Sequence, residues 1–171
     1  MKETLFVAKQ ETSMMATLRK VSFFKKLEER HIQDVLKMSR LRQFDAGETI
    51  IPEGVYDTYV YVLLGGEVEV HKKGATISIM NKIGDIFGEL AIINDEPRSA
   101  SISARTSTTC LAIDAAFLDS LMSRVQDTIY AVVYKIFAEI VANRLRVTSR
   151  ELTVAREENR ELRLKLEKLQ S

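Results

Sequence analysis

Hydrophobic residues near the N-terminus recur every three or four positions, which is the spacing of one face of a helix. The pattern predicts two short helices, over residues 17–27 and 29–38. Residues 1–16 carry scattered apolar side chains and are interpreted as a further helical lead-in with no assigned role. The helical pattern is carried by Phe23, Phe24, Leu27, His31, Ile32, Val35 and Leu36.

The middle of the chain alternates between polar and apolar residues, as half-buried strands do. Strands are expected over residues 59–64, 67–71, 75–80 and 105–113. All seven glycines lie between Gly47 and Gly88, so the turns of the chain are concentrated there. Short strands joined by frequent turns favour an antiparallel barrel or sandwich.

The C-terminal part has the pattern of a long helix, with a possible cap at Asp127. From Ala131 to Leu169 the seam residues follow one another in alternating steps of three and four, the heptad of a coiled coil. Asn159 occupies an a position, which favours a parallel pair of helices in register. In such a pair, opposite charges would meet between two chains, Glu151 with Arg156 and Glu158 with Arg163. The alternative is a helix packed on its own domain, which explains only the early, apolar part.

Length and charge narrow the possible classes of protein. The chain has 171 residues, of which 46% are hydrophobic, which suits one domain of ordinary size or one domain with an extension. Its net charge of +1 argues against a general nucleic-acid coat. No apolar leader is evident, and charged residues interrupt the most apolar helical stretch, so neither a signal peptide nor a membrane span is expected. We therefore expect a cytoplasmic protein.

Cysteine and histidine are scarce. Cys110 is the single cysteine, so an internal disulfide is excluded. With only His31 and His71 beside it, a zinc cluster is not expected. Cys110 is interpreted as a small apolar strand residue rather than a reactive thiol.

The segment from Phe87 to Ser101 carries the candidate chemistry. Gly88 would let the backbone approach a ligand, and a helical turn over residues 89–93 would offer free amides to an anion. Arg98 could donate two hydrogen bonds to a phosphate, and Ser99 could add a hydroxyl. Glu89 fits such a site only if it accepts hydrogen bonds from ligand hydroxyls. A sugar phosphate would supply both the anion for Arg98 and the hydroxyls for Glu89. Alternatively, the segment is an ordinary helix start with a solvated ion pair between Arg98 and its acidic neighbours.

This segment resembles the phosphate-binding cassette of cyclic nucleotide-binding domains, the family that includes catabolite activator protein and the regulatory subunits of protein kinase A. The pattern Phe-Gly-Glu-Leu-Ala, then Pro-Arg-Ser-Ala, stands unbroken from Phe87 to Ala100. The resemblance covers roughly residues 18–150. It implies that Glu89 accepts the ribose 2′-hydroxyl and that Arg98 pairs with the cyclic phosphate. The implied cassette residues are Gly88, Glu89, Leu90, Arg98, Ser99 and Ala100.

Residues 142–149 also resemble the dimer helix of catabolite activator protein. The resemblance implies that Thr148 contacts the base in its own subunit and that Ser149 contacts it across the interface. Arg144 would lie near the phosphate. No helix-turn-helix module follows this helix in the sequence, so DNA binding by this chain alone is not expected.

Together these features predict an α+β fold, a jelly-roll-like antiparallel β-roll with flanking helices and a long C-terminal dimerisation helix that continues as a coiled coil. The expected divisions are a lead-in (1–16), a nucleotide-binding domain (17–125) and a dimerisation helix (126–171). The predicted function is a homodimeric, non-enzymatic receptor for cAMP, with cGMP as the alternative ligand, which needs no metal or cofactor and acts on an unidentified output protein. The competing classes are a nucleotide-free dimerisation protein and the sensor part of a transcription regulator. An enzyme is disfavoured because no nucleophile or metal set accompanies Glu89 and Arg98.

Overall fold

The computed structural model divides the chain into two units, Met1–Val132 and Val133–Ser171, which are described separately here. The structure describes residues 2–5, 18–19, 21–25, 27–37, 39–90, 96–114 and 128–170. Within this part of the chain, no helix is both long enough and apolar enough to cross a membrane.

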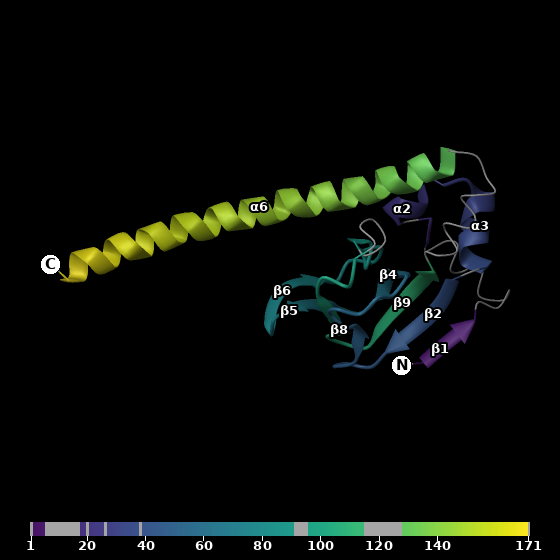
Figure 1. Cartoon of the computed structure of the whole chain (residues 1–171), viewed down its shortest axis with the longest axis horizontal. Helices are drawn as coiled ribbons and strands as arrows, with labels where there is room; N and C mark the ends of the chain where they lie inside the picture. Colours follow the sequence, from purple (N-terminus) through teal and green to yellow (C-terminus); the bar gives the residue numbers. More distant parts are fainter. Residues whose placement is uncertain are drawn as a thin grey trace. The chain divides into compact units, whose positions relative to one another are not determined.

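Two antiparallel sheets form most of the first unit (Figure 1). One sheet has the order β1 (Lys2–Leu5), β2 (Ser39–Phe44), β9 (Thr108–Asp114), β4 (Tyr59–Gly65), β7 (Ile86–Phe87). The other has the order β3 (Thr49–Ile51), β8 (Ser101–Ala104), β5 (Val68–Lys72), β6 (Ala75–Met80). Every strand pairing within both sheets is antiparallel, which confirms the predicted class of fold.

The core draws residues from both sheets. Side chains alternate along a strand, so one face of each sheet can be apolar while the other is not. Strand β5 shows this, because Val68 is fully buried in the core and Val70 packs against it, while the polar residues Glu69 and His71 alternate with them. The buried cluster consists of Phe44, Ile50, Ile51, Tyr61, Leu63, Val68, Phe87, Ile102, Ala104, Cys110 and Ala112. Cys110 is thus a core residue, and burial raises the pKa of its thiol to about 12.

The central strands of the five-stranded sheet are buried on both faces. In β9, Leu111 and Ile113 alternate with the core residues Cys110 and Ala112, and all four are buried. In the sequence, strands of this kind appear as continuous apolar runs rather than as an alternation of polar and apolar residues. Helix α3 (Glu29–Lys37) contributes Ile32, Val35 and Leu36 to the buried set, and the Ser39 hydroxyl at the start of β2 donates to the Val35 carbonyl at 2.6 Å.

The N-terminal segment differs from the prediction. The expected helical lead-in is wrong for Lys2–Leu5, which form strand β1 paired with residues 40–43 of β2. Pairing with a sheet edge outweighs the weak local helical preference of four residues. The helix expected over residues 17–27 is represented by the shorter α2 (Ser22–Lys25), whereas the helix expected over residues 29–38 is confirmed by α3.

The strand predicted last in the chain is shorter than expected, and the strand before it was not predicted. The strand expected over residues 105–113 begins only at Thr108, and β8 over Ser101–Ala104 precedes it as a separate strand of the other sheet. The connecting turn is fixed by two bonds, from the Arg105 amide to the Glu67 carbonyl at 2.8 Å and from the Thr108 hydroxyl to the Thr106 carbonyl at 2.9 Å. The chain therefore changes sheets over residues 105–107, where the sequence predicted the start of a strand.

The second unit is helical. Helix α6 runs from Thr128 to Gln170, which is 43 residues or about 65 Å at 1.5 Å per residue. It thus covers the whole predicted heptad. Five leucines of the predicted seam are each at least 49% exposed in the single chain: Leu145, Leu152, Leu162, Leu166 and Leu169.

Candidate functional site

The phosphate cassette begins where β7 ends. Phe87 pairs with Tyr61 of β4, and the chain leaves the sheet at Gly88. Gly88 has a φ of 84°, a conformation that L-residues rarely adopt. A Cβ at this position would lie 2.8 Å from Arg98 Nη1 and 3.0 Å from the Tyr59 carbonyl oxygen. Glycine is therefore required for the close approach of the backbone to Arg98.

Arg98 is the central cation of the site. It is 4% exposed, although arginine is rarely so deeply buried without partners. Its Nη1 donates to the Gly88 carbonyl at 2.6 Å, and its Nη2 donates to the Tyr59 carbonyl at 2.5 Å. Nη2 also lies 3.1 Å from Asp57 Oδ2, which supplies an opposite charge.

The backbone around Arg98 is fixed as well. Its carbonyl accepts from the Gly54 amide at 2.8 Å, and its amide donates to the Val55 carbonyl at 3.0 Å. The third nitrogen of the guanidinium, Nε, is buried and has no hydrogen-bond partner among the described residues. A buried polar atom of this kind calls for a partner. Arg98 thus keeps a free donor on a rigidly held side chain.

Glu89 places a buried carboxylate immediately after Gly88, whose carbonyl accepts from this cation. Its side chain is 1% exposed and is among the largest fully buried side chains of the described residues. A buried carboxylate is stabilised by hydrogen-bond donors. A buried acid and a buried base around Gly88 suit a ligand that offers both hydroxyl donors and an anionic group.

The other cassette residues frame this pair. Leu90 is 41% exposed, Ser99 is exposed and Ala100 is half-buried. The helical turn expected over residues 89–93 is described only as far as Leu90, because residues 91–95 lie outside the described residues. The phosphate role of Ser99 and of the amides remains a prediction.

The three predicted contacts on the helix lie in the second unit. Arg144 is half-buried on α6, while Thr148 and Ser149 are exposed. The Ser149 carbonyl accepts from the Thr153 hydroxyl at 2.9 Å, an ordinary bond of residues four apart on a helix. The cassette belongs to the first unit, and the two units are described separately. The role of these three residues in contacts with the ligand therefore stays a prediction.

Two partners of Arg98 were not identified from the sequence. Asp57 looks like an ordinary turn residue, and its Oδ1 does accept from the Tyr59 amide two residues on, at 2.8 Å. Its second oxygen faces Arg98, which the spacing could not show. The Tyr59 carbonyl is a backbone acceptor and leaves no signal in a sequence.

Comparisons with known proteins agree with this geometry. Residues 41–125 match the family described as "Cyclic nucleotide-binding domain". The chain is 31% identical to the cGMP-dependent protein kinase of Eimeria tenella over 113 residues, 66% of this chain and 11% of that protein. It is 34% identical to the cAMP-dependent protein kinase regulatory subunit of Aspergillus fumigatus over 108 residues, 63% of this chain and 25% of that protein. The chain therefore spans only a small part of these relatives.

A solved structure gives the same result for the fold. The catabolite activator protein of Thermus thermophilus superimposes with a TM-score of 0.61 at 26% identity, over 77% of this chain and 62% of that chain. The antiparallel sheets with a C-terminal helix are thus those of a known β-roll.

Proposed function

Because residues 41–125 belong to the cyclic nucleotide-binding domain family, we propose that this chain is a receptor module for a cyclic nucleotide. The observation that carries the proposal is the buried guanidinium of Arg98, which donates to the Gly88 carbonyl while its Nε has no hydrogen-bond partner among the described residues, together with the buried carboxylate of Glu89 next to Gly88 in the chain. In this proposal the Arg98 guanidinium binds the cyclic phosphate and Glu89 accepts the ribose 2′-hydroxyl. Gly88, Leu90, Ser99 and Ala100 supply the remaining cassette contacts.

The proposed ligand is cAMP, with cGMP as the alternative. The names of the relatives include both a cGMP-dependent and a cAMP-dependent kinase, so they support the nucleotide class more than the base. Thr148 favours adenine, because its hydroxyl can accept from the 6-amino group. Ser99 weakens that preference, because a hydroxyl after the cassette arginine can also serve guanine.

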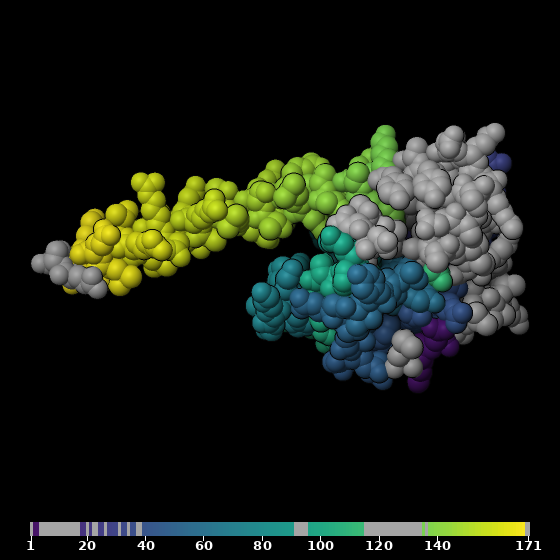
Figure 2. All heavy atoms as spheres, viewed as in Figure 1, coloured from purple at the N-terminus to yellow at the C-terminus, as the bar shows by residue number. Residues whose placement is uncertain are grey.

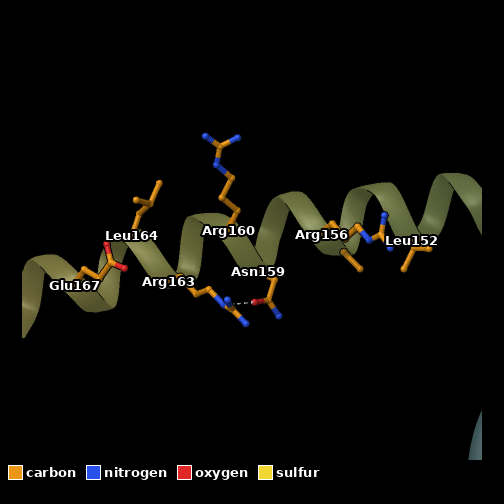
Figure 3. A pocket seen from close by; sticks show the side chains of 8 residues that line it. Leu152, Arg156, Asn159, Arg160, Arg163, Leu164 and Glu167 are labelled. Atoms are coloured by element: carbon orange, nitrogen blue, oxygen red, sulfur yellow. Dashed lines mark hydrogen bonds between the residues drawn. The ribbon is translucent and has the colours of Figure 1, made fainter.

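We propose further that α6 joins two chains as a parallel coiled coil. Figure 3 shows Asn159 and Arg163 on one side of the helix, joined by a hydrogen bond from Arg163 Nε to Asn159 Oδ1 of 3.1 Å, while Arg160 and Leu164 point to the other side. This separation agrees with the heptad, in which Asn159 lies in the predicted seam and Arg163 borders it. Leu152 is also a heptad residue and is 49% exposed in the single chain, which argues for a covering helix.

The proposed division of labour follows the sequence. Residues 17–125 would bind the nucleotide and residues 126–171 would dimerise, with Thr148 reading the base in its own subunit and Ser149 across the interface. Arg144 would face the phosphate. Binding would then shift the population of helix arrangements, with a coupling of about 1–3 kcal/mol to an output protein. Such a module is regulatory and cytoplasmic, and it is not itself an enzyme.

Calorimetry with cAMP and cGMP side by side tests the proposal. Arg98→Ala should weaken binding at least about tenfold, since a hydrogen bond to a charged group contributes about 1.5–3 kcal/mol. The matched control is Arg105→Ala, which removes an arginine whose side chain is 52% exposed and should not change the affinity. A wild-type protein that binds neither nucleotide would instead support the competing class, a nucleotide-free dimerisation protein.

A comparison of cAMP with 2′-deoxy cAMP tests Glu89 in the same assay. The deoxy nucleotide should bind more weakly to the wild type, and Glu89→Gln should narrow the difference. An unchanged preference would remove Glu89 from the sugar site.

A further inference from the structure

A second arginine lies beside the same strand that holds Arg98. The guanidinium carbon of Arg42 lies 4.1 Å from the centre of the Tyr59 ring and 5.8 Å from that of Tyr61. Its Nη1 donates to the Tyr61 hydroxyl at 2.7 Å. Burial raises the pKa of Tyr61 to about 12, and this hydroxyl accepts from Arg42 as a neutral group.

The N-terminal strand holds Arg42 in this place. In the register of β1 with β2, Glu3 pairs directly with Arg42. Glu3 Oε2 accepts from Arg42 Nε at 2.8 Å, and Glu3 Oε1 accepts from Arg40 Nη1 at 2.5 Å. The Arg42 side chain is only 13% exposed, so this ion pair is worth more than a solvated one.

Both arginines contact Tyr59, but they contact different groups of it. Arg42 packs on the ring of Tyr59, while Arg98 takes the carbonyl of Tyr59. Tyr61 in turn stacks on Phe87, with ring centres 5.3 Å apart and planes at 6°. Phe87 directly precedes Gly88, whose carbonyl is the other acceptor of Arg98. One carbonyl that holds Arg98 thus belongs to a residue that Arg42 contacts directly, and the other is connected to Arg42 through the stacked rings of Phe87 and Tyr61.

We propose that Arg42, held by Glu3, is a positioning residue for Arg98, so that strand β1 sets the geometry of the phosphate anchor. Its effect on nucleotide affinity rests on the proposed function, but its effect on Arg98 does not. Loss of the Arg42 contacts would let Tyr59 and Phe87 shift, and with them the two carbonyls. A donor displaced from its ligand by a fraction of an ångström loses much of its hydrogen bond.

The position of Arg98 can be measured without a nucleotide. The 15N–1H resonance of Arg98 Nε, assigned through Arg98→Lys, reports the surroundings of that buried donor. Arg42→Met and Glu3→Gln should both move this resonance. The matched control is Glu29→Gln, which breaks an exposed ion pair with Arg19 (2.7 Å) and should leave the resonance in place. An unmoved resonance in Arg42→Met would overturn the proposal.

Binding separates this proposal from the proposed function. If the wild type binds cAMP, Arg42→Met should bind about tenfold more weakly and should discriminate less between the two diastereomers of cAMP that carry sulfur on the phosphate. Arg42→Lys, which keeps the charge, should lie between wild type and Arg42→Met. Equal affinity and equal discrimination in the wild type, Arg42→Lys and Arg42→Met would refute the positioning role of Arg42 and leave the proposed function standing.

Two further outcomes are decisive. Absence of binding by the wild type would refute the proposed function and the ligand consequence together, while the resonance of Arg98 would still decide whether Arg42 positions it. Should Arg42→Met fail to fold in a thermal melt, Arg42→Lys and Glu3→Gln supply the same two measurements, and no effect in either variant would overturn the proposal.

Discussion

At the scale of single residues, the site depends on Gly88. Its backbone carbonyl holds Arg98 Nη1 at 2.6 Å, and only the missing side chain lets the two come so close. Two costs would follow from a larger residue, one for the positive φ and one for the contact with Arg98. The two costs can be separated, because Gly74 has a similar φ of 79° with nothing within 4 Å of a Cβ built there.

Gly88→Ala should therefore lower stability more than Gly74→Ala. Gly74→Ala should lower the free energy of unfolding by about 1 kcal/mol, through backbone strain alone. Gly88→Ala should cost about 1–3 kcal/mol and should weaken cAMP binding as well, which Gly74→Ala should not do. Urea unfolding and calorimetry give the two quantities. Equal losses of stability with unchanged affinity would mean that Arg98 moves aside at no cost.

At the scale of elements, strand β1 makes stability depend on pH. Hydrogen bonds from Arg40 and Arg42 hold the pKa of Glu3 below its ordinary value of 4.5. A carboxylate whose pKa is lower in the folded state stabilises the fold above its unfolded pKa, and this contribution is lost as the pH falls through the lowered folded pKa.

Glu3→Gln should accordingly be less stable than the wild type at pH 7, by about 1 kcal/mol. The difference should shrink as the pH falls below 4.5. Chemical denaturation at a series of pH values measures this. Glu29→Gln again serves as control, because loss of its solvated ion pair should change stability by less than about 0.5 kcal/mol at every pH. A deficit that stays constant with pH would exclude the charged form of Glu3 as its source.

The same elements show how far the sequence could predict the structure. Strand β5 was found because Val68 and Val70 alternate with polar residues, and α3 because its apolar residues keep helical spacing. The cassette was found because Gly88, Glu89 and Arg98 stand in a recognisable pattern. Local patterns of this kind are visible in a sequence because they need no distant partner.

Features that depend on distant partners were missed. Strand β1 exists because β2, more than thirty residues later, offers it an edge. The change of sheet before Thr108 depends on a bond from Arg105 to Glu67. Asp57 and Arg42 act on the site through tertiary contacts, so nothing in their neighbouring residues distinguishes them from ordinary turn or surface residues.

At the scale of the whole molecule, the seam of α6 can be tested with a matched pair of leucines. Leu152 and Leu164 are almost equally exposed in the single chain, at 49% and 50%. Only Leu152 lies at a seam position, whereas Leu164 points to the other side of the helix in Figure 3. Burial of a leucine contributes about 1.5–3 kcal/mol, so only one of the two should affect assembly.

Leu152→Lys should weaken the dimer by about a hundredfold or more and should lower nucleotide affinity with it, because assembly and binding are linked. Leu164→Lys should change neither. Sedimentation reports the dimer and competitive binding reports the affinity. A monomeric wild type would contradict the proposed dimer. A monomeric Leu152→Lys protein with full affinity would contradict the proposed link between dimerisation and nucleotide binding.

Thr148→Ala should act on the base alone. It removes one hydroxyl at an exposed seam position, so the dimer should persist while the preference for cAMP over cGMP falls several-fold, as expected for one neutral hydrogen bond of about 1 kcal/mol. Competition between the two nucleotides measures the preference. An unchanged preference would mean that residues other than Thr148 recognise the base.

The β5–β6 hairpin, teal in Figure 2, has a consequence for solubility. Strand β6 is the edge of its sheet and exposes Ile77 at 57% and Ile79 at 43%, a combination that invites aggregation by strand addition. Two such edges meeting antiparallel would bring Lys72 and Lys73 of one copy near Lys82 of the other, and all three lysines are exposed. The repulsion between these lysines opposes the contact, and salt screens it. The folded protein should therefore be most resistant to aggregation at low ionic strength.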